Sequence, residues 1–249
     1  MHRFYVETPI SDIGAHVVLS AEESAHAAKV LRLRPGEEIR LLDGENLWAA
    51  ELETVDPKET TALVTEKCPS PEAPSHAVLI QGLPKADKLE LIAQKGTELG
   101  MRELWPVEME RSVAKADKAD KADKKRERLS RIAMEAAKQS GRAHVPEVAP
   151  TVSFSKVLDK LTDFDLVLVA WEEEHALPMS QAVRHYADEH GVPKRVGIVI
   201  GPEGGISQTE WQKLHDLGAV SVTLGPRILR TETAGLCALS VLWTALGEM

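Results

Sequence analysis

The pattern of apolar and polar residues changes near residue 75. Before that point, short apolar or β-branched runs are separated by turn residues, at 16–20, 37–44, 47–55 and 61–67. After it, longer apolar runs alternate with amphipathic segments. The first pattern is typical of a small β-rich domain, and the second is typical of an α/β domain with a largely parallel sheet.

One helix is predicted inside the β-rich part. Ser20 is a good N-cap for the segment 21–33, and Pro35 and Gly36 end it. The stretch 68–75 places three prolines between the two patterned regions, which is typical of a linker. We therefore expect a first domain over residues 1–70 and a second over residues 76–249.

The second part alternates strands with helices. Apolar runs predict buried strands at 77–83, 103–107, 165–171, 195–201 and 220–225. The segment 85–99 is amphipathic and ends at Gly100, so it predicts a helix, as does the segment 128–140. We expect Thr231 to cap a last, very apolar helix.

Three loops after predicted strands carry residues suited to ligand binding, at 170–175, 200–207 and 224–235. In open parallel sheets, ligands bind beyond the carboxyl ends of the strands. The second loop reads Gly-Pro-Glu-Gly-Gly, and Ser207 with Glu210 predicts a capping box after it. Because the loop matches neither G-x-G-x-x-G nor a Walker A motif, it argues against a phosphate cradle. Its backbone groups still suit a purine and a ribose.

The third loop combines two arginines with an acid. Arg227 and Arg230 lie in the loop, and Glu232 falls in the first turn of the last helix, where a carboxylate suits the helix dipole. These residues fit an ion-paired helix cap. They equally fit a site that holds an anionic substrate and manages a proton.

Charge and composition narrow the function classes. The 249 residues carry a net charge of -9, yet residues 85–142 hold 15 Lys and Arg against 11 Asp and Glu. A polyanionic partner would therefore have to bind local basic patches, because the net negative charge of the whole chain would repel it. A Lys-Ala-Asp repeat at 115–125 predicts a solvated helix extension or loop, with a polyphosphate-contacting arm as the alternative.

The remaining composition predicts a cytoplasmic protein. There is no apolar run of about 18 residues, so we expect no membrane partner, and the N-terminus lacks a signal-peptide layout. Cys68 and Cys237 stand far apart, and no His/Cys cluster has metal spacing, so we expect no metal.

Five motifs in order resemble one known family. They are QGLPKADKLELIAQKGTELG, ERSVAK, EAAKQSGRAHVPEV, IGPEGGIS and LGPRILRTETA. This set resembles the RsmE family of bacterial 16S rRNA (uracil-N3)-methyltransferases, in the SPOUT superfamily. The stretches HRFYV and KVLRLRPGEEIRLLDG resemble that family's PUA-like β-barrel. Lys138, where the family often has Glu, and Leu129, where an aromatic residue is common, depart from the pattern.

The resemblance implies an α/β fold with a mainly parallel sheet, preceded by a PUA-like β-barrel. The SPOUT domain would contain a deep trefoil knot, roughly at 196–249, as an exception to the rule against knots. S-adenosylmethionine would bind in the knot, and the last helix would pack in a homodimer. The reaction would form N3-methyluridine in the decoding region of 16S rRNA, with the assembled small ribosomal subunit as substrate.

The resemblance also assigns roles to residues of the three loops. Arg230 and Glu232 would be catalytic, since a guanidinium can stabilise charge on the base and a carboxylate can accept the N3 proton. The expected cofactor-binding residues are Ala170, Trp171, Ile200, Gly201, Glu203, Gly204, Gly205, Leu224, Gly225, Ile228 and Leu229. The expected phosphate contacts are Arg3, Lys29, Arg32, Arg34, Arg111, Lys115 and Arg142.

Other readings of the sequence stay open. The chain could be a non-catalytic RNA-binding factor for ribosome assembly, which would bind RNA without using S-adenosylmethionine. It could be a nucleotide-dependent enzyme acting on a small molecule, which would not respond to ribosomal subunits. It could also methylate another base in rRNA or tRNA, because the resemblance alone names the base.

Overall fold

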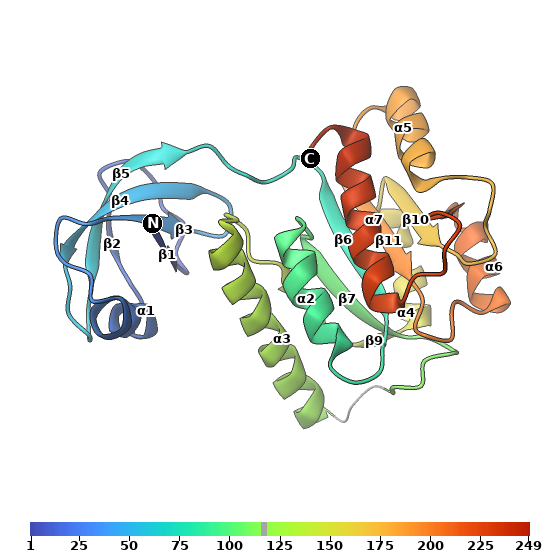
Figure 1. Cartoon of the computed structure of the whole chain (residues 1–249), viewed down its shortest axis with the longest axis horizontal. Coiled ribbons are helices and arrows are strands. Elements are labelled where there is room, and N and C mark those ends of the chain that lie inside the picture. The colour runs from blue at the N-terminus through green and yellow to red at the C-terminus, as the bar shows by residue number, and fades with distance from the viewer. Residues whose placement is uncertain (116–118) are drawn as a thin grey trace. The chain divides into compact units, whose positions relative to one another are not determined.

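A computed structural model describes residues 1–115 and 119–249, and these divide into two compact units (Figure 1). The first unit contains residues 1–72 and 135–145, and the second contains residues 73–134 and 146–249. This division differs from the predicted one, because residues 135–145 group with the first unit. Within the Lys-Ala-Asp repeat, residues 116–118 lie outside the described residues, and α3 (Ala119–Ser140) contains the rest from residue 119 onward.

The first unit is built on a five-stranded sheet. Its order is β1-β3-β4-β5-β2, with β1 parallel to β3 and the other pairs antiparallel. The strands are β1 (His2–Tyr5), β2 (His16–Val18), β3 (Glu38–Leu42), β4 (Leu47–Thr54) and β5 (Thr61–Cys68). Phe4, Ile39 and Leu41 are fully buried in its core, as the alternating sequence pattern requires.

The helix predicted over 21–33 is two short helices. Ser20 caps α1 (Ala21–Ala25) by accepting a hydrogen bond from the backbone N–H of Glu23, as predicted. The chain then widens into a π-helix, η1 (His26–Leu31), and Arg32 ends it in the left-handed conformation with φ 55°. This conformation is common at the end of a helix but uncommon for a residue other than glycine.

A buried aspartate organises the turn between β3 and β4. Asp43 accepts hydrogen bonds from the backbone N–H groups of Ile10, Glu45 and Asn46 and from the indole of Trp48, at 2.6–3.3 Å. Burial by itself raises the pKa of Asp43, but these hydrogen bonds outweigh it, and the pKa lies below its usual value.

Asp43→Ala is expected to lower the free energy of unfolding by about 2 kcal/mol, because it leaves the Trp48 indole buried without an acceptor. Since the folded pKa is lowered, the contribution of Asp43 is complete above its usual pKa and is lost as pH falls through the lowered value. Urea unfolding at neutral and acidic pH measures both effects. The exposed Asp12→Ala serves as control, and equal losses in the two variants would contradict the assignment.

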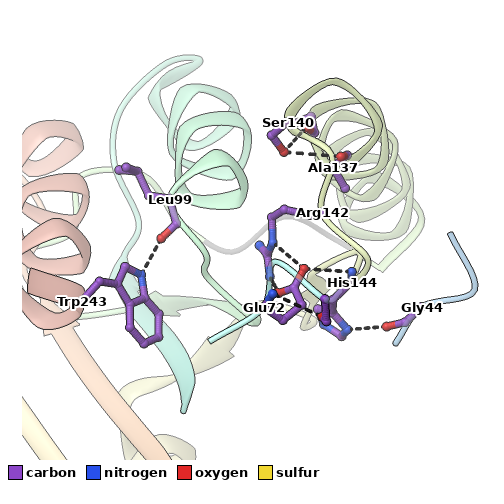
Figure 2. Close-up of polar contacts among 10 residues, drawn as sticks. Gly44, Glu72, Leu99, Ala137, Ser140, Arg142, His144 and Trp243 are labelled. Carbon is purple, nitrogen blue, oxygen red and sulfur yellow. Dashed lines mark hydrogen bonds and ion pairs between the residues drawn. The ribbon is translucent and has the colours of Figure 1, made fainter. Parts of the chain in front are cut away.

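A buried ion pair fastens residues 135–145 to the first unit. Arg142 donates to Glu72 at 2.6 Å and 3.2 Å, and the His144 backbone donates to the same carboxylate (Figure 2). His144 Nδ1 lies 2.9 Å from the Gly44 carbonyl oxygen. Lys138, which departs from the family pattern, is paired with Glu23. These contacts explain why the end of α3 groups with the first unit.

The second unit is built on a parallel sheet, as predicted. Its order is β12-β10-β11-β6-β7-β8, with β9 also paired to β7, and every pairing between its described strands is parallel. The strands are β6 (His76–Gly82), β7 (Glu103–Glu108), β8 (Glu147–Val148), β9 (Val152–Ser153), β10 (Leu166–Ala170), β11 (Arg195–Ile200) and β12 (Val220–Val222).

Helices cover both faces of this sheet, which is why its strands are continuously apolar. Successive residues of β6 alternate between the two cores, so that Leu79 packs on one side and Ile80 on the other. The first face packs against α2 (Lys88–Glu98), α3, α5 (Met179–His190) and α7 (Thr231–Leu246). The second packs against α4 (Phe154–Leu158), η2 (Leu161–Asp163) and α6 (Gln208–Asp216).

The last helix lies along the first face beside α2. The Trp243 indole donates a 2.6 Å hydrogen bond to the carbonyl of Leu99, which is the C-cap of α2 (Figure 2). This bond ties the end of α7 to the end of α2. Among the described residues, no helix is long and apolar enough to cross a membrane.

Candidate functional site

The three predicted loops meet at one cavity of about 450 Å³ in the second unit. It opens where β10, β11 and β12 end, and these strands are neighbours in the sheet. Because they are parallel, their carboxyl ends lie at the same edge. Lys88 and Ala234 complete the wall. The size suits a ligand no larger than a typical cofactor.

All the predicted cofactor residues except Gly204 line this cavity. Gly204 instead packs outward against Arg111, whose backbone oxygen would lie 3.0 Å from a Cβ added at Gly204. Arg111 also donates a 3.2 Å hydrogen bond to the Gly204 carbonyl. Gly204 therefore keeps the loop close to the segment after β7, and this role differs from the predicted one.

The glycine-rich loop is fixed at its far end by the predicted capping box. Ser207 and Glu210 exchange both hydrogen bonds of that motif, and both side chains are buried. The Ser207 hydroxyl also donates to Glu110 at 2.7 Å, and the Glu110 backbone donates to Glu210 at 2.8 Å. The loop is thus anchored on α6 and on the ERSVAK segment.

Trp171 forms part of the cavity wall with one ring face already covered. Its ring stacks on Trp211 at 4.4 Å between centroids and 17° between planes. Trp211 is held in turn by a 2.7 Å hydrogen bond from its indole to Ser221. Only the remaining face or the edge of Trp171 is left for a ligand.

Thr231 does not cap the last helix, so that prediction was wrong. Arg230 occupies the N-cap position, and Thr231 is the first helical residue. The Thr231 hydroxyl accepts a 2.8 Å hydrogen bond from the Gln81 amide and donates a 2.7 Å hydrogen bond to the Gly201 carbonyl. Gln81 and Thr231 are both buried, and they join β6, α7 and the glycine-rich loop.

The two predicted catalytic residues stand at the start of α7. Arg230 is exposed and lines the cavity, whereas the Glu232 side chain is 13% exposed. Burial raises the pKa of Glu232, but the helix N–H, Lys88 and the nearby Arg230 charge outweigh it, and the pKa lies below its usual value. Glu232 is therefore a carboxylate at neutral pH.

Lys88 is a site residue that the sequence analysis missed. Its ammonium lies 2.8 Å from Glu203 Oε1 and 3.1 Å from Glu232 Oε2. The Glu203 carboxylate also accepts hydrogen bonds from the backbone N–H of Lys85 at 3.1 Å and 3.4 Å. Glu203 lines the cavity as predicted, but its carboxylate already accepts hydrogen bonds from Lys85 and Lys88.

The five predicted phosphate contacts in the first unit differ from one another in solvent exposure. Lys29, Arg32 and Arg34 are exposed around η1. Arg3 is half-buried and donates to the carbonyls at the end of α3, at 3.1 Å and 3.3 Å. Arg142 is 5% exposed and paired with Glu72, so its guanidinium does not face a phosphate and we remove it from the set.

The second unit holds the other two predicted phosphate contacts. Arg111 is exposed while holding Gly204. Lys115 has an exposed side chain that lies 3.3 Å from Glu108. Both follow β7, on the segment that supports the glycine-rich loop. Among the described residues, no group of three or more His, Cys, Asp or Glu side chains could hold a metal ion.

Comparisons with known proteins agree over nearly the whole chain. A family model described as an RNA methyltransferase domain matches residues 71–243, and one described as an RNA methyltransferase PUA domain matches residues 19–64. Ribosomal RNA small subunit methyltransferase E of Bacillus subtilis is 39% identical over 97% of this chain and 96% of its own. The protein of that name from Mycobacterium bovis is 35% identical over 95% of this chain and 88% of its own.

Solved structures give the same result. A ribosomal RNA small subunit methyltransferase E from Neisseria gonorrhoeae, bound to S-adenosyl methionine, has a TM-score of 0.82 at 31% identity, over 98% of this chain and 97% of its own. A methyltransferase from Legionella pneumophila, in complex with the same cofactor, has a TM-score of 0.81 at 31% identity over the same shares. The family model for the PUA domain matches within the first unit, so this unit contains a PUA domain.

Proposed function

The chain belongs to the RNA methyltransferase family that includes the ribosomal RNA small subunit methyltransferase E proteins, and from this premise we propose that it methylates N3 of a uridine in 16S rRNA. The chain is an rRNA methyltransferase that uses S-adenosylmethionine. The target base and the substrate particle are the proposed part. The observation that carries the proposal is one cavity lined by both the glycine-rich loop and Arg230, with Glu232 held beside it by the lining residue Lys88.

The cavity residues fit S-adenosylmethionine. Residues 200–203, 205–206 and 222–229 line the cavity with the backbone of two loops, and Trp171 offers an aromatic surface. Glu172 and Glu203 line the cavity, and Glu232 is paired with Lys88, which also lines it. The negative charge of these carboxylates complements a sulfonium cation. When bound, the cofactor supplies an electrophilic methyl group.

Residues 230–232, which we call the catalytic turn, can prepare the base for methylation. Uridine N3 carries a proton and is a poor nucleophile while neutral, so its proton must be lost and the resulting charge stabilised. The ionised Glu232 can accept a hydrogen bond from N3–H and take the proton. Arg230, exposed at the N-cap, can donate to the O2 or O4 atom on which charge develops. Because N3 is on the Watson–Crick edge, the uridine must be unpaired.

We extend the proposal to the finer features that the family resemblance implies. Residues 196–249 form the trefoil knot, and the first unit closes as a PUA-like β-barrel. Two chains pair through α7, whose mean hydropathy is high and whose half-buried Leu236, Cys237 and Val241 remain for a partner. An rRNA substrate also supports a cytoplasmic location.

RNA docking is proposed to use Lys29, Arg32 and Arg34 in the first unit and Arg111 and Lys115 in the second. All five are exposed, and phosphate contacts by such residues supply affinity and register. Because the first domain is acidic overall, we expect weak binding to free RNA and expect the assembled small subunit to be the better substrate.

Transfer of a labelled methyl group to unmethylated small subunits, free 16S rRNA and tRNA tests the proposed substrate. We expect transfer to subunits and little to either free RNA. Binding of RNA without transfer to any substrate would favour the ribosome assembly factor, and efficient transfer to tRNA would favour a different target. Cofactor binding with no response to RNA would favour an enzyme for small molecules.

Thr231→Val is expected to weaken S-adenosylmethionine binding by about tenfold, because it removes the hydroxyl that holds the Gly201 carbonyl. Thr231→Ser keeps the hydroxyl and is expected to bind almost as the unmodified protein does. Titration calorimetry measures both. An unchanged affinity in Thr231→Val would show that the hydrogen bonds from Gln81 to Thr231 and from Thr231 to Gly201 do not shape the glycine-rich loop, residues 200–207, which we call the cofactor loop.

A further inference from the structure

The segment between β6 and α2 has an unusual shape. The helix predicted from residue 85 begins only at Lys88, because Ala86 has a left-handed φ of 53° that a helix cannot contain. Asp87 occupies the N-cap position, yet its side chain makes no capping hydrogen bond. Backbone strain of this kind persists where surrounding contacts impose it. Because Asp87 does not cap the helix, contacts to another part of the chain must impose the turn at Ala86.

Contacts to Glu203 account for that shape. The Lys85 backbone N–H and the Lys88 ammonium both reach this carboxylate, from either side of Ala86. The turn at Ala86 therefore brings two donors, three residues apart in sequence, onto one acceptor. Glu203 belongs to the loop after β11, so these two contacts hold the cofactor loop against residues 85–88.

The same ammonium also reaches the catalytic turn. Glu232 Oε2 is buried, and the Lys88 ammonium at 3.1 Å provides its compensating charge. Without a cation between them, the two carboxylates would repel one another, and the largely buried Glu232 would lose its ion-pair partner. Lys88 thus joins two loops that each line the cavity.

We propose that Lys88 is a positioning residue that clamps Glu203 and Glu232 together, so that the cofactor loop and the catalytic turn form one rigid wall and Glu232 is directed at the substrate. This inference rests on the proposed function of the same cavity. Lys88 is not a proton acceptor in this scheme. Hydrogen bonds from Lys88 to Glu203 and then to Glu232 raise its pKa, so it remains an ammonium at neutral pH.

The direct test replaces Lys88 with methionine, which keeps the length and removes the charge, and with arginine, which restores it. Titration of Glu232 is followed by NMR on protein with isotope-labelled glutamate, with Glu232→Gln to assign the signal. In Lys88→Met we expect the pKa of Glu232 to rise, because its counter-ion is gone, and in Lys88→Arg we expect it to return toward that of the unmodified protein. Unchanged Glu232 titration in Lys88→Met would overturn the proposal.

Kinetics supply the second readout. Lys88→Met is expected to lower kcat by about 10- to 100-fold and to shift the acid limb of the pH profile upward, with partial recovery in Lys88→Arg. Lys95→Met is the matched control, because Lys95 lies on the same helix and pairs with Glu98 at the surface. A loss of equal size at every pH, without recovery in Lys88→Arg, would reduce Lys88 to a structural residue and overturn the proposal.

The two readouts separate the inference from the proposed function. If the unmodified protein transfers no methyl group to RNA, the proposed function fails, yet the NMR titration still decides whether Lys88 controls Glu232. If the unmodified protein is active and Lys88→Met titrates and reacts like it, the proposed function stands and the clamp is wrong.

Discussion

Arg230→Ala is expected to lower kcat for methyl transfer by about 100- to 1000-fold, while S-adenosylmethionine affinity stays within about threefold. Arg230 is exposed at the N-cap of α7 and lines the cavity, so its guanidinium is free to reach a base placed there. A donor that acts on charge developing in the transition state contributes to kcat far more than to ground-state binding. Single-turnover kinetics together with calorimetry measure the two quantities separately.

The control for Arg230→Ala is Arg184→Ala, which removes an exposed arginine from α5. It is expected to keep kcat within about twofold, since surface substitutions away from the site have small effects. If Arg230→Ala weakened cofactor binding and left kcat unchanged, Arg230 would be a cofactor ligand, and the assignment of its role in the reaction would be wrong.

Gly82→Ala is expected to reduce S-adenosylmethionine affinity at least 100-fold and to abolish measurable transfer. A Cβ at Gly82 would lie 2.6 Å from the backbone nitrogen of Pro202 and 2.9 Å from the carbonyl carbon of Gly201. These are backbone atoms of the cofactor loop, so a side-chain rotation cannot relieve the clash. The loop must move away from β6, and a displacement of about 1 Å in a positioned site is enough to cause a loss of this size.

Gly191→Ala provides the comparison for Gly82→Ala. Gly191 ends α5 with φ 83° and open space around its Cβ position, so alanine there strains the backbone without touching the cavity. It is expected to lower the free energy of unfolding by about 1 kcal/mol and to leave cofactor affinity unchanged. Normal affinity in a folded Gly82→Ala protein would contradict the close packing of β6 against the loop.

The parallel sheet could be predicted because its strands are buried on both faces and therefore read as continuous apolar runs. The π-helix could not, because its widened turn and the left-handed Arg32 depend on tertiary contacts rather than on periodicity. The amphipathic pattern over 128–140 likewise predicts a helix without saying which core it joins. The pairing of Arg142 with Glu72, 70 residues away in sequence, places its end in the first unit.

The location of the site could be predicted from one rule, that ligands bind beyond the carboxyl ends of parallel strands. Individual roles were less predictable. Thr231 resembles a helix cap in sequence, yet its partners are Gln81 and Gly201, and Gln81 is 150 residues away. Lys88 resembles an ordinary solvated lysine at a helix start, because only the fold brings Glu203 and Glu232 to it.

The measurement that tests the central claim most directly is nucleoside analysis of small-subunit RNA after reaction with the purified protein and S-adenosylmethionine. The account predicts one new methylated nucleoside, N3-methyluridine, which forms about 100- to 1000-fold more slowly with Arg230→Ala. A methyl group on another atom of uridine or on another base would contradict the proposed chemistry of Arg230 and Glu232, while leaving the chain an rRNA methyltransferase.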